Sequence, residues 1–247
     1  ATEQLEQEQS VEIFFCALNM IQKLMDCPDV AIYRVNKEKY ARLFAYSSAK
    51  AASMGSTVYL PDKKPLDEAC NENRVYINRS MEKEDPMMAY NVESEEQMEI
   101  LIMLWSIPFE RMTINEANRL IVIGKLIQTS VRRADRYLEA LSEERYHSES
   151  QILKASAFEE LVGAYRKASK EKLTEYVLLQ IEVEGKNEKE TVDKCTLLLR
   201  ESDYIGNLSD GKLYLLLTNT DLNGCSFVQN KLKQNGVASS ISEEGGL

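Results

Sequence analysis

Residues 197–218 read LLLRESDYIGNLSDGKLYLLLT, and this segment is the most informative one for the fold of the C-terminal half of the chain. Three leucines close a helical pattern before Arg200, and a short apolar run follows Asp203. Asp210 and Gly211 separate this run from a longer one. An Asp-Gly pair between two apolar runs is a strong signal for a tight β-hairpin. The stretch therefore predicts a helix, a turn, a strand, a hairpin and a second strand in succession.

Helical and strand-like patterns alternate on both sides of this stretch. The predicted elements are a strand at 176–184, a helix at 191–199, strands at 204–208 and 213–218, a helix at 221–232 and a strand at 237–241. This order of elements predicts one small α/β domain.

The N-terminal half carries a different series of patterns. Apolar residues recur at helical spacing from Leu5 to Leu24, and Pro28 ends this helix. Thr113 and Glu116 form a capping box that opens a long helix. Strand-like runs lie between the two helices, at 30–35, 40–46, 57–60, 75–78 and 99–107. These patterns predict a second α/β domain.

We therefore predict an α+β protein in which long helices join two α/β domains in tandem. The first domain spans residues 1–143, a linking helix spans 144–171, and the second domain spans 172–247. The length of 247 residues fits two domains of ordinary size.

Composition narrows the possible ligands. The net charge of −10 disfavours binding to a nucleic acid polymer, so an anionic ligand needs a local basic group. The five cysteines lack C-x-x-C spacing, and His147 is the only histidine. This pattern offers no metal site and is typical of a reduced, cytosolic protein. No apolar run reaches the ~18 residues of a membrane helix.

Arg200 and Asp203 are suited to reading guanine. A guanidinium can donate to O6 and N7 of the base as a fork, while a carboxylate can accept from the N1 and N2 hydrogens. The alternative is a solvated ion pair at a helix end. The same R-x-x-D spacing occurs at Arg132 and Asp135 inside a long helical pattern with no hairpin behind it. Context therefore selects Arg200 and Asp203.

This layout resembles the GGDEF domain of diguanylate cyclases, where an R-x-x-D inhibitory site for cyclic di-GMP precedes the catalytic hairpin. Here Ser209 and Asp210 stand in place of the two glycines of that hairpin. Gly211 and Lys212 stand in place of its two acids, and Gln180 stands at a metal-binding Asp. The resemblance implies a degenerate GGDEF-like domain that binds the dinucleotide, with no catalytic residues, no metal and no cofactor.

A third basic residue completes the inhibitory site in that family. Counting from Asp203 without gaps places Lys231 at the position of this Arg. Lysine keeps the positive charge but loses the planar fork of arginine. The resemblance implies Arg200, Asp203 and Lys231 as ligand-binding residues, while the alternative for Lys231 is an ordinary exposed helix residue.

The N-terminal half resembles a GAF domain in the order of its elements. A GAF-like domain before a degenerate GGDEF-like domain resembles the PelD family, receptors of the Pel exopolysaccharide machinery. That resemblance implies an intercalated dimer of cyclic di-GMP as ligand, polysaccharide-synthesis proteins of the membrane as partners and a role in biofilm formation. It also implies a place at the cytoplasmic face of the bacterial membrane, with membrane helices upstream. The family also uses an Arg near the start of its GAF domain, whereas the first Arg here is Arg34.

Two other functions remain open. The GAF-like domain could bind a different small molecule while the degenerate domain only relays a signal, or the chain could process a nucleotide weakly. For the receptor, we expect Arg200→Ala or Asp203→Ala to abolish binding and to leave the melting temperature nearly unchanged.

Overall fold

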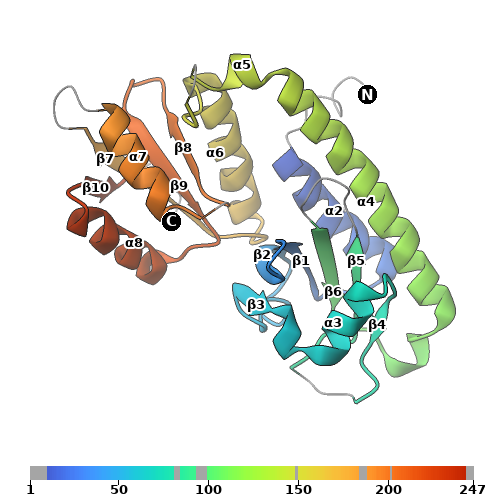
Figure 1. Cartoon of the computed structure of the whole chain (residues 1–247). Helices are drawn as coiled ribbons and strands as arrows, with labels where there is room; N and C mark the ends of the chain where they lie inside the picture. Colours follow the sequence, from blue (N-terminus) through green and yellow to red (C-terminus); the bar gives the residue numbers. More distant parts are fainter. Residues whose placement is uncertain are drawn as a thin grey trace. The chain divides into compact units, whose positions relative to one another are not determined.

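The computed structural model describes residues 10–80, 84–92, 99–147, 150–183, 188–200 and 202–242 (Figure 1). The chain divides into two compact units, Ala1–Arg136 and Tyr137–Leu247. Both units mix helices with an antiparallel sheet, so the α+β prediction is confirmed. Residues before Ser10, Leu5 among them, lie outside the described residues.

The first unit is built around a six-stranded sheet with the strand order β3-β2-β1-β6-β5-β4. The strands are β1 (Val30–Val35), β2 (Tyr40–Tyr46), β3 (Thr57–Tyr59), β4 (Tyr76–Ile77), β5 (Met88–Val92) and β6 (Glu99–Leu104). The helices are α2 (Ser10–Met25), α3 (Lys64–Asn71) and α4 (Ile114–Ala140), whose last residues belong to the second unit. Short 3₁₀ turns occupy Leu60–Asp62 and Phe109–Arg111.

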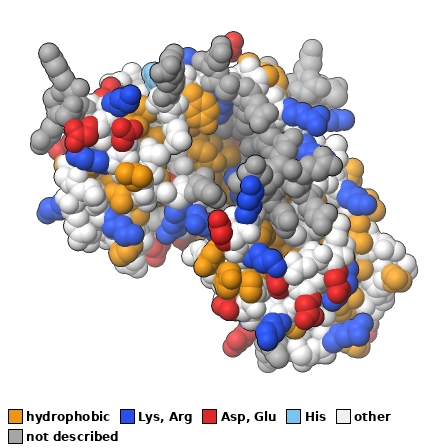
Figure 2. All heavy atoms as spheres, in the orientation of Figure 1, with side chains coloured by type: hydrophobic (Ala, Val, Ile, Leu, Met, Phe, Trp, Pro, Cys, Tyr) orange, Lys and Arg blue, Asp and Glu red, His pale blue; other side chains and the backbone are white. Residues whose placement is uncertain are grey.

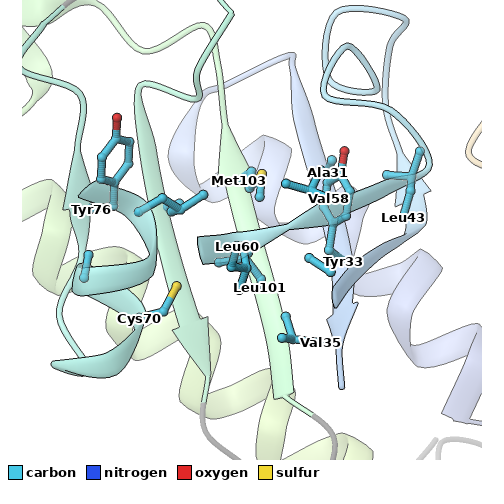
Figure 3. Close-up of a cluster of buried hydrophobic side chains, with 14 of the residues drawn as sticks. Ala31, Tyr33, Val35, Leu43, Val58, Leu60, Cys70, Tyr76, Leu101 and Met103 are labelled. Atoms are coloured by element: carbon cyan, nitrogen blue, oxygen red, sulfur yellow. The ribbon is translucent and has the colours of Figure 1, made fainter. Parts of the chain in front are cut away.

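Both faces of this sheet are buried. On one face, Tyr33 and Leu101 pack with residues of α3 in a continuous apolar cluster (Figure 3). On the other face, Phe14 of α2 lies 4.8 Å from Phe44, measured between ring centroids. A Cβ on Gly124 of α4 would lie 2.8 Å from the Val92 side chain, so α4 approaches β5 closely there. The sheet is therefore a central layer between α3 and the pair α2 and α4.

The predicted strands of this unit are confirmed, with shorter ends at 57–60, 75–78 and 99–107. Thr113 caps α4, because the Glu116 amide donates to its hydroxyl at 3.4 Å. Sequence reasoning missed α3 and β5. All five residues of β5 are buried, so it has no alternation of polar and apolar residues to reveal it.

The second unit contains a four-stranded antiparallel sheet with the order β10-β7-β9-β8. Its elements are α5 (Ser142–Arg145), α6 (Ala155–Lys170), β7 (Tyr176–Glu182), α7 (Glu188–Leu198), β8 (Tyr204–Asn207), β9 (Leu213–Thr218), α8 (Leu222–Gln234) and β10 (Ala238–Ile241). The predicted order from β7 to β10 is confirmed, and α7 begins three residues earlier than predicted, at Glu188 instead of 191.

Helices cover both faces of this sheet as well. Residues of α7 and α8, including Cys195 and Leu232, join the apolar cluster on one face. On the other face, α6 packs so closely that a Cβ on Gly206 would lie 2.4 Å from the Phe158 ring. Only glycine fits at this point of β8. In this order β8 lies at one edge of the sheet, so one side of its backbone is open to pairing with another segment.

Surface features agree with the composition. On the face drawn in Figure 2, acidic and basic side chains are interspersed. Cys27, Cys70, Cys195 and Cys225 are buried and Cys16 is exposed. Within the described ranges, none of the helices has the length and hydropathy needed to cross a bilayer.

Candidate functional site

Arg200 and Asp203 lie in a tight turn between α7 and β8. The backbone amide of Asp203 donates to the Arg200 carbonyl at 3.0 Å, and one Asp203 carboxylate oxygen accepts from the Arg200 amide at 3.1 Å. The two residues therefore close the turn in both directions. Glu201, between them, lies outside the described residues.

The same carboxylate also holds the turn to β9. Its other oxygen accepts from the Thr218 amide at 3.0 Å, and the Thr218 hydroxyl donates to the Ser202 carbonyl at 3.0 Å. Thr218 is the last residue of β9 and is buried. Asp203 thus joins two segments of backbone that the sequence separates by 15 positions.

Burial raises the pKa of the Asp203 carboxyl above its ordinary value. The amides of Thr218 and Arg200, and then the Arg200 charge, act in the opposite direction because each favours the carboxylate. Burial has the larger effect, so the pKa of Asp203 is raised overall. The Asp203 carboxylate accepts hydrogen bonds from two backbone amides and so helps to hold the fold together. We therefore no longer expect Asp203→Ala to leave the melting temperature nearly unchanged.

Arg200 contrasts with its partner in the turn. Its side chain is exposed and makes no hydrogen bond or ion pair with any other residue in the described part of the chain. A guanidinium carries five N–H donors in a planar fork. All of these donors are available to a ligand as far as the described residues are concerned.

A pocket of about 630 Å³ opens beside this arginine. Small-molecule sites commonly measure roughly 300 to 1,000 Å³. The pocket has three walls: the end of α7, the start of β8 and a segment that precedes α6. The lining residues are Tyr146, Ser150, Gln151, Leu153, Thr196, Leu199, Arg200, Asp203, Tyr204 and Ile205.

The third wall is a short hairpin, formed by residues 145–147 and 150–154, which we call the edge hairpin. The His147 amide donates to the Ile152 carbonyl at 3.0 Å, and the Lys154 amide donates to the Arg145 carbonyl at 2.8 Å. Leu153 then pairs with β8: its amide donates to the Ile205 carbonyl at 2.9 Å, and its carbonyl accepts from the Asn207 amide at 3.0 Å. The edge hairpin therefore extends the sheet beyond β8.

Sequence reasoning did not assign the edge hairpin to the site. The sequence predicts a linking helix over 144–171, whereas in the structure this helix, α6, begins at Ala155 and the edge hairpin precedes it. Residues 142–150 are mostly polar and show no strand period, so no local signal predicts the hairpin. His147 is exposed, and its ring nitrogen lies 3.1 Å from the Asn207 side-chain oxygen.

Lys231 lies in the last turn of α8 and is exposed. Its ammonium lies 4.6 Å from the centroid of the Phe227 ring. It is not among the residues that line the pocket. The structure therefore brings Arg200 and Asp203 together at the pocket and places Lys231 outside its lining.

The hairpin between β8 and β9 occupies the place of the catalytic hairpin in the resemblance. Gly211 takes a positive φ of 74°, which the tight turn requires. The Lys212 ammonium lies 3.2 Å from the Gln180 side-chain oxygen and 3.8 Å from the Asp210 carboxylate. Lys212 itself stands at one acid position of the resemblance, and its ammonium lies beside Gln180, which stands at a metal-binding Asp. In the described ranges, no group of His, Cys, Asp and Glu is arranged to hold a metal ion.

Arg34 and Arg132 both lie outside this pocket lining. The Arg34 guanidinium lies over two neighbouring rings, 5.2 Å from the centroid of Phe14 and 5.3 Å from that of Phe44. Arg132 lies within α4, as its helical context predicts.

No family profile and no curated protein matches the chain. Among solved structures, PelD from Pseudomonas aeruginosa in complex with c-di-GMP is similar at 12% identity and a TM-score of 0.39, over 94% of this chain and 82% of that chain. PelD from strain PAO1 of the same organism, also in complex with c-di-GMP, gives a TM-score of 0.42 at 12% identity, over 98% and 86% of the two chains. A sensor histidine kinase domain from Sinorhizobium meliloti gives a TM-score of 0.36 at 14% identity, over 53% and 96%.

Proposed function

We propose that this chain is a receptor for cyclic di-GMP and binds the dinucleotide in the pocket beside Arg200. The observation that carries the proposal is the exposed Arg200 side chain, which has no partner among the described residues and lies on the lining of a pocket of suitable size. In a chain of net charge −10, such a group is the kind of local cation that an anionic ligand needs.

The chemistry of guanine fits this arrangement. The Arg200 fork donates to O6 and N7 of the base. One Asp203 carboxylate oxygen accepts from both the amide and the hydroxyl of Thr218. The other oxygen accepts only the Arg200 amide hydrogen among the described residues, and its second lone-pair direction can accept from N1 or N2 of the base. Lys231, from outside the pocket lining, adds positive charge for the phosphates of a second, intercalated ligand molecule.

The proposed receptor has no catalytic role. Gln180 and Lys212 lie where a cyclase needs carboxylates, and the Lys212 ammonium repels the metal that would assist phosphate chemistry. The receptor instead regulates Pel-type exopolysaccharide synthesis, and through it biofilm formation. It acts at the cytoplasmic face of the bacterial membrane, through the membrane proteins that make the polymer.

Calorimetry of the purified chain with cyclic di-GMP tests the proposal. We expect the wild type to bind. Arg200→Ala should weaken binding by about 5- to 150-fold, the value of one bidentate base contact, which is a smaller effect than the complete loss expected from the sequence. Arg200→Lys is the matched control, because it keeps the charge without the fork. An absence of binding heat in the wild type contradicts the proposal, and turnover of GTP with Mg²⁺ contradicts its non-catalytic part.

A second candidate function is a sensor for another small molecule in the first unit. A pocket of about 950 Å³ lies there between α3 and β4, and its lining includes the basic residues Lys63, Lys64, Arg74 and Arg79. Lys63 is already paired with Asp85 at 2.7 Å. A metabolite that co-purifies with the chain and is lost on Arg79→Ala, but not on Arg200→Ala, would favour this function.

A further inference from the structure

The pocket beside Arg200 carries aromatic residues on two of its walls. Tyr146 comes from the edge hairpin, and Tyr204 is the first residue of β8. No motif of the resemblance includes either tyrosine. Their positions raise the question of what the flat part of a ligand would contact.

The edge hairpin holds Tyr146 in a defined place. Leu153 is buried and is hydrogen-bonded on both sides to β8, while Ile152 belongs to the apolar core of the unit. Tyr146 itself pairs with Leu153 across the hairpin. Because these contacts are part of the folded sheet, the wall that carries Tyr146 is present before any ligand binds.

The phenols of Tyr146 and Tyr204 are near enough to interact electrostatically. Burial raises the pKa of Tyr146, the charge of Arg145 lowers it, and the neighbouring Tyr204 phenol raises it again by a smaller amount. Tyr146 still exposes 36% of its surface, and Tyr204 is half-buried. Neither ring is engaged by another aromatic ring of the described residues, so their faces are not covered by ring stacking.

Gln151 adds a polar group to the same wall. It is exposed, and its carboxamide makes no hydrogen bond with another residue in the described ranges. A carboxamide offers both a donor and an acceptor, which matches the mixed edges of a purine.

We propose that Tyr146 and Tyr204 form a stacking wall for one purine base, so that the edge hairpin determines specificity together with the Arg200 turn. The identity of the nucleotide rests on the function proposed above. Arg200 contacts the edge of the base while the tyrosines contact its face, and these two kinds of contact do not compete. Aromatic faces hold nucleobases in many single-stranded nucleic acid sites by the same physics.

The test compares ring-removing with ring-keeping variants in calorimetry with cyclic di-GMP. We expect Tyr146→Leu and Tyr204→Leu each to weaken binding by about 5- to 150-fold, and Tyr146→Phe and Tyr204→Phe to bind like the wild type. Melting temperatures of all four variants show whether each is folded. If a Leu variant does not fold, the NMR signal of guanine H8 decides: it moves upfield on binding to the wild type and the Phe variants if the base stacks.

The outcomes separate the two proposals. Wild-type binding that is lost on Arg200→Ala but unchanged in both Leu variants, or an H8 signal that does not move, overturns the stacking wall and leaves the receptor intact. If the wild type does not bind cyclic di-GMP, the wild type and the same variants are titrated with GMP, AMP and cyclic di-AMP. Ring-dependent binding of one of these supports the wall and overturns the cyclic di-GMP receptor. Binding of none overturns both.

Discussion

The chain turns sharply at both ends of β8, and each turn places a basic residue near an aspartate. In the turn before β8, the Asp203 carboxylate bonds to backbone amides and the Arg200 side chain is exposed without a described partner. In the hairpin after β8, the Lys212 ammonium lies against the side chains of Gln180 and Asp210. The cation of the first turn is therefore available to a ligand, whereas the cation of the second turn is already in contact with other side chains of the protein.

This difference shows why a sequence motif and a binding site are not the same thing. Two cations at opposite ends of one strand carry equal charge, yet only a group whose donors are unused gains hydrogen bonds when a ligand arrives. The two turns differ in what their carboxylates contact: Asp203 accepts from backbone amides of two separate segments, whereas Asp210 accepts within its own hairpin and lies near the Lys212 ammonium. Three substitution experiments test this contrast.

The largest effect is expected from removing the two carboxylates in turn. Asp203→Ala leaves the amides of Arg200 and Thr218 without an acceptor, so we expect a loss of about 1 to 3 kcal/mol in the free energy of unfolding. Asp210→Ala is the matched control, because this exposed carboxylate bonds within its own hairpin, to the Lys212 amide and the Tyr214 hydroxyl. Urea denaturation of both variants measures the difference. Equal losses would contradict a special structural role for Asp203.

A smaller effect is expected from the cations. Lys212→Ala removes an exposed contact with Gln180 and Asp210, so we expect a change of less than about 1 kcal/mol in the free energy of unfolding. We also expect cyclic di-GMP to bind this variant as it binds the wild type, in contrast to Arg200→Ala. Calorimetry of the two alanine variants side by side makes the comparison. A loss of binding in Lys212→Ala would move the site to the second turn.

The smallest effect is a difference in pH dependence. The pKa of Asp203 is raised in the folded state, mainly by burial, whereas the pKa of Asp210 is lowered, mainly by its hydrogen bond from the Lys212 amide. Asp203 therefore adds stability below its ordinary pKa of 3.8 and loses it as the pH rises through the folded value. Asp210 adds stability above that ordinary value and loses it as the pH falls through its own folded pKa.

Melting temperatures measured across the acidic range test these signs. The wild type minus Asp203→Asn should gain relative stability as the pH falls, and the wild type minus Asp210→Asn should lose it. Parallel curves for the two differences would contradict the opposite environments of the carboxylates.

Much of the fold is predictable from local patterns. The order from β7 to β10 follows from periodicity, and the hairpin after β8 follows from Asp210 and Gly211, whose backbone has the positive φ that favours glycine. The strand β5 was missed because burial on both sides removes the alternation that reveals a strand. The alternation of polar and apolar residues depends on one face of a strand being exposed to solvent, so it cannot reveal a strand that is buried on both faces.

The candidate site was predictable only in part. Spacing and hairpin context selected Arg200 and Asp203, and the structure places both on one pocket lining. Lys231 was reached by counting along a family pattern, and it lies outside that lining. Tyr146 and Gln151 carried no signal at all, because they reach the pocket only through the pairing of Leu153 with β8.

The two-part α+β architecture, the turn of Arg200 and Asp203, and the replacement of acids by Gly211 and Lys212 can all be read from local sequence, because they depend on residue identity and short-range spacing. Only the tertiary structure decided that Asp203 is tied to Thr218, that Lys212 meets Gln180, and that an edge hairpin walls the pocket. Those contacts join segments far apart in the chain. Their partners are set by which strand lies at the edge of the sheet, and the strand order is a property of the whole fold.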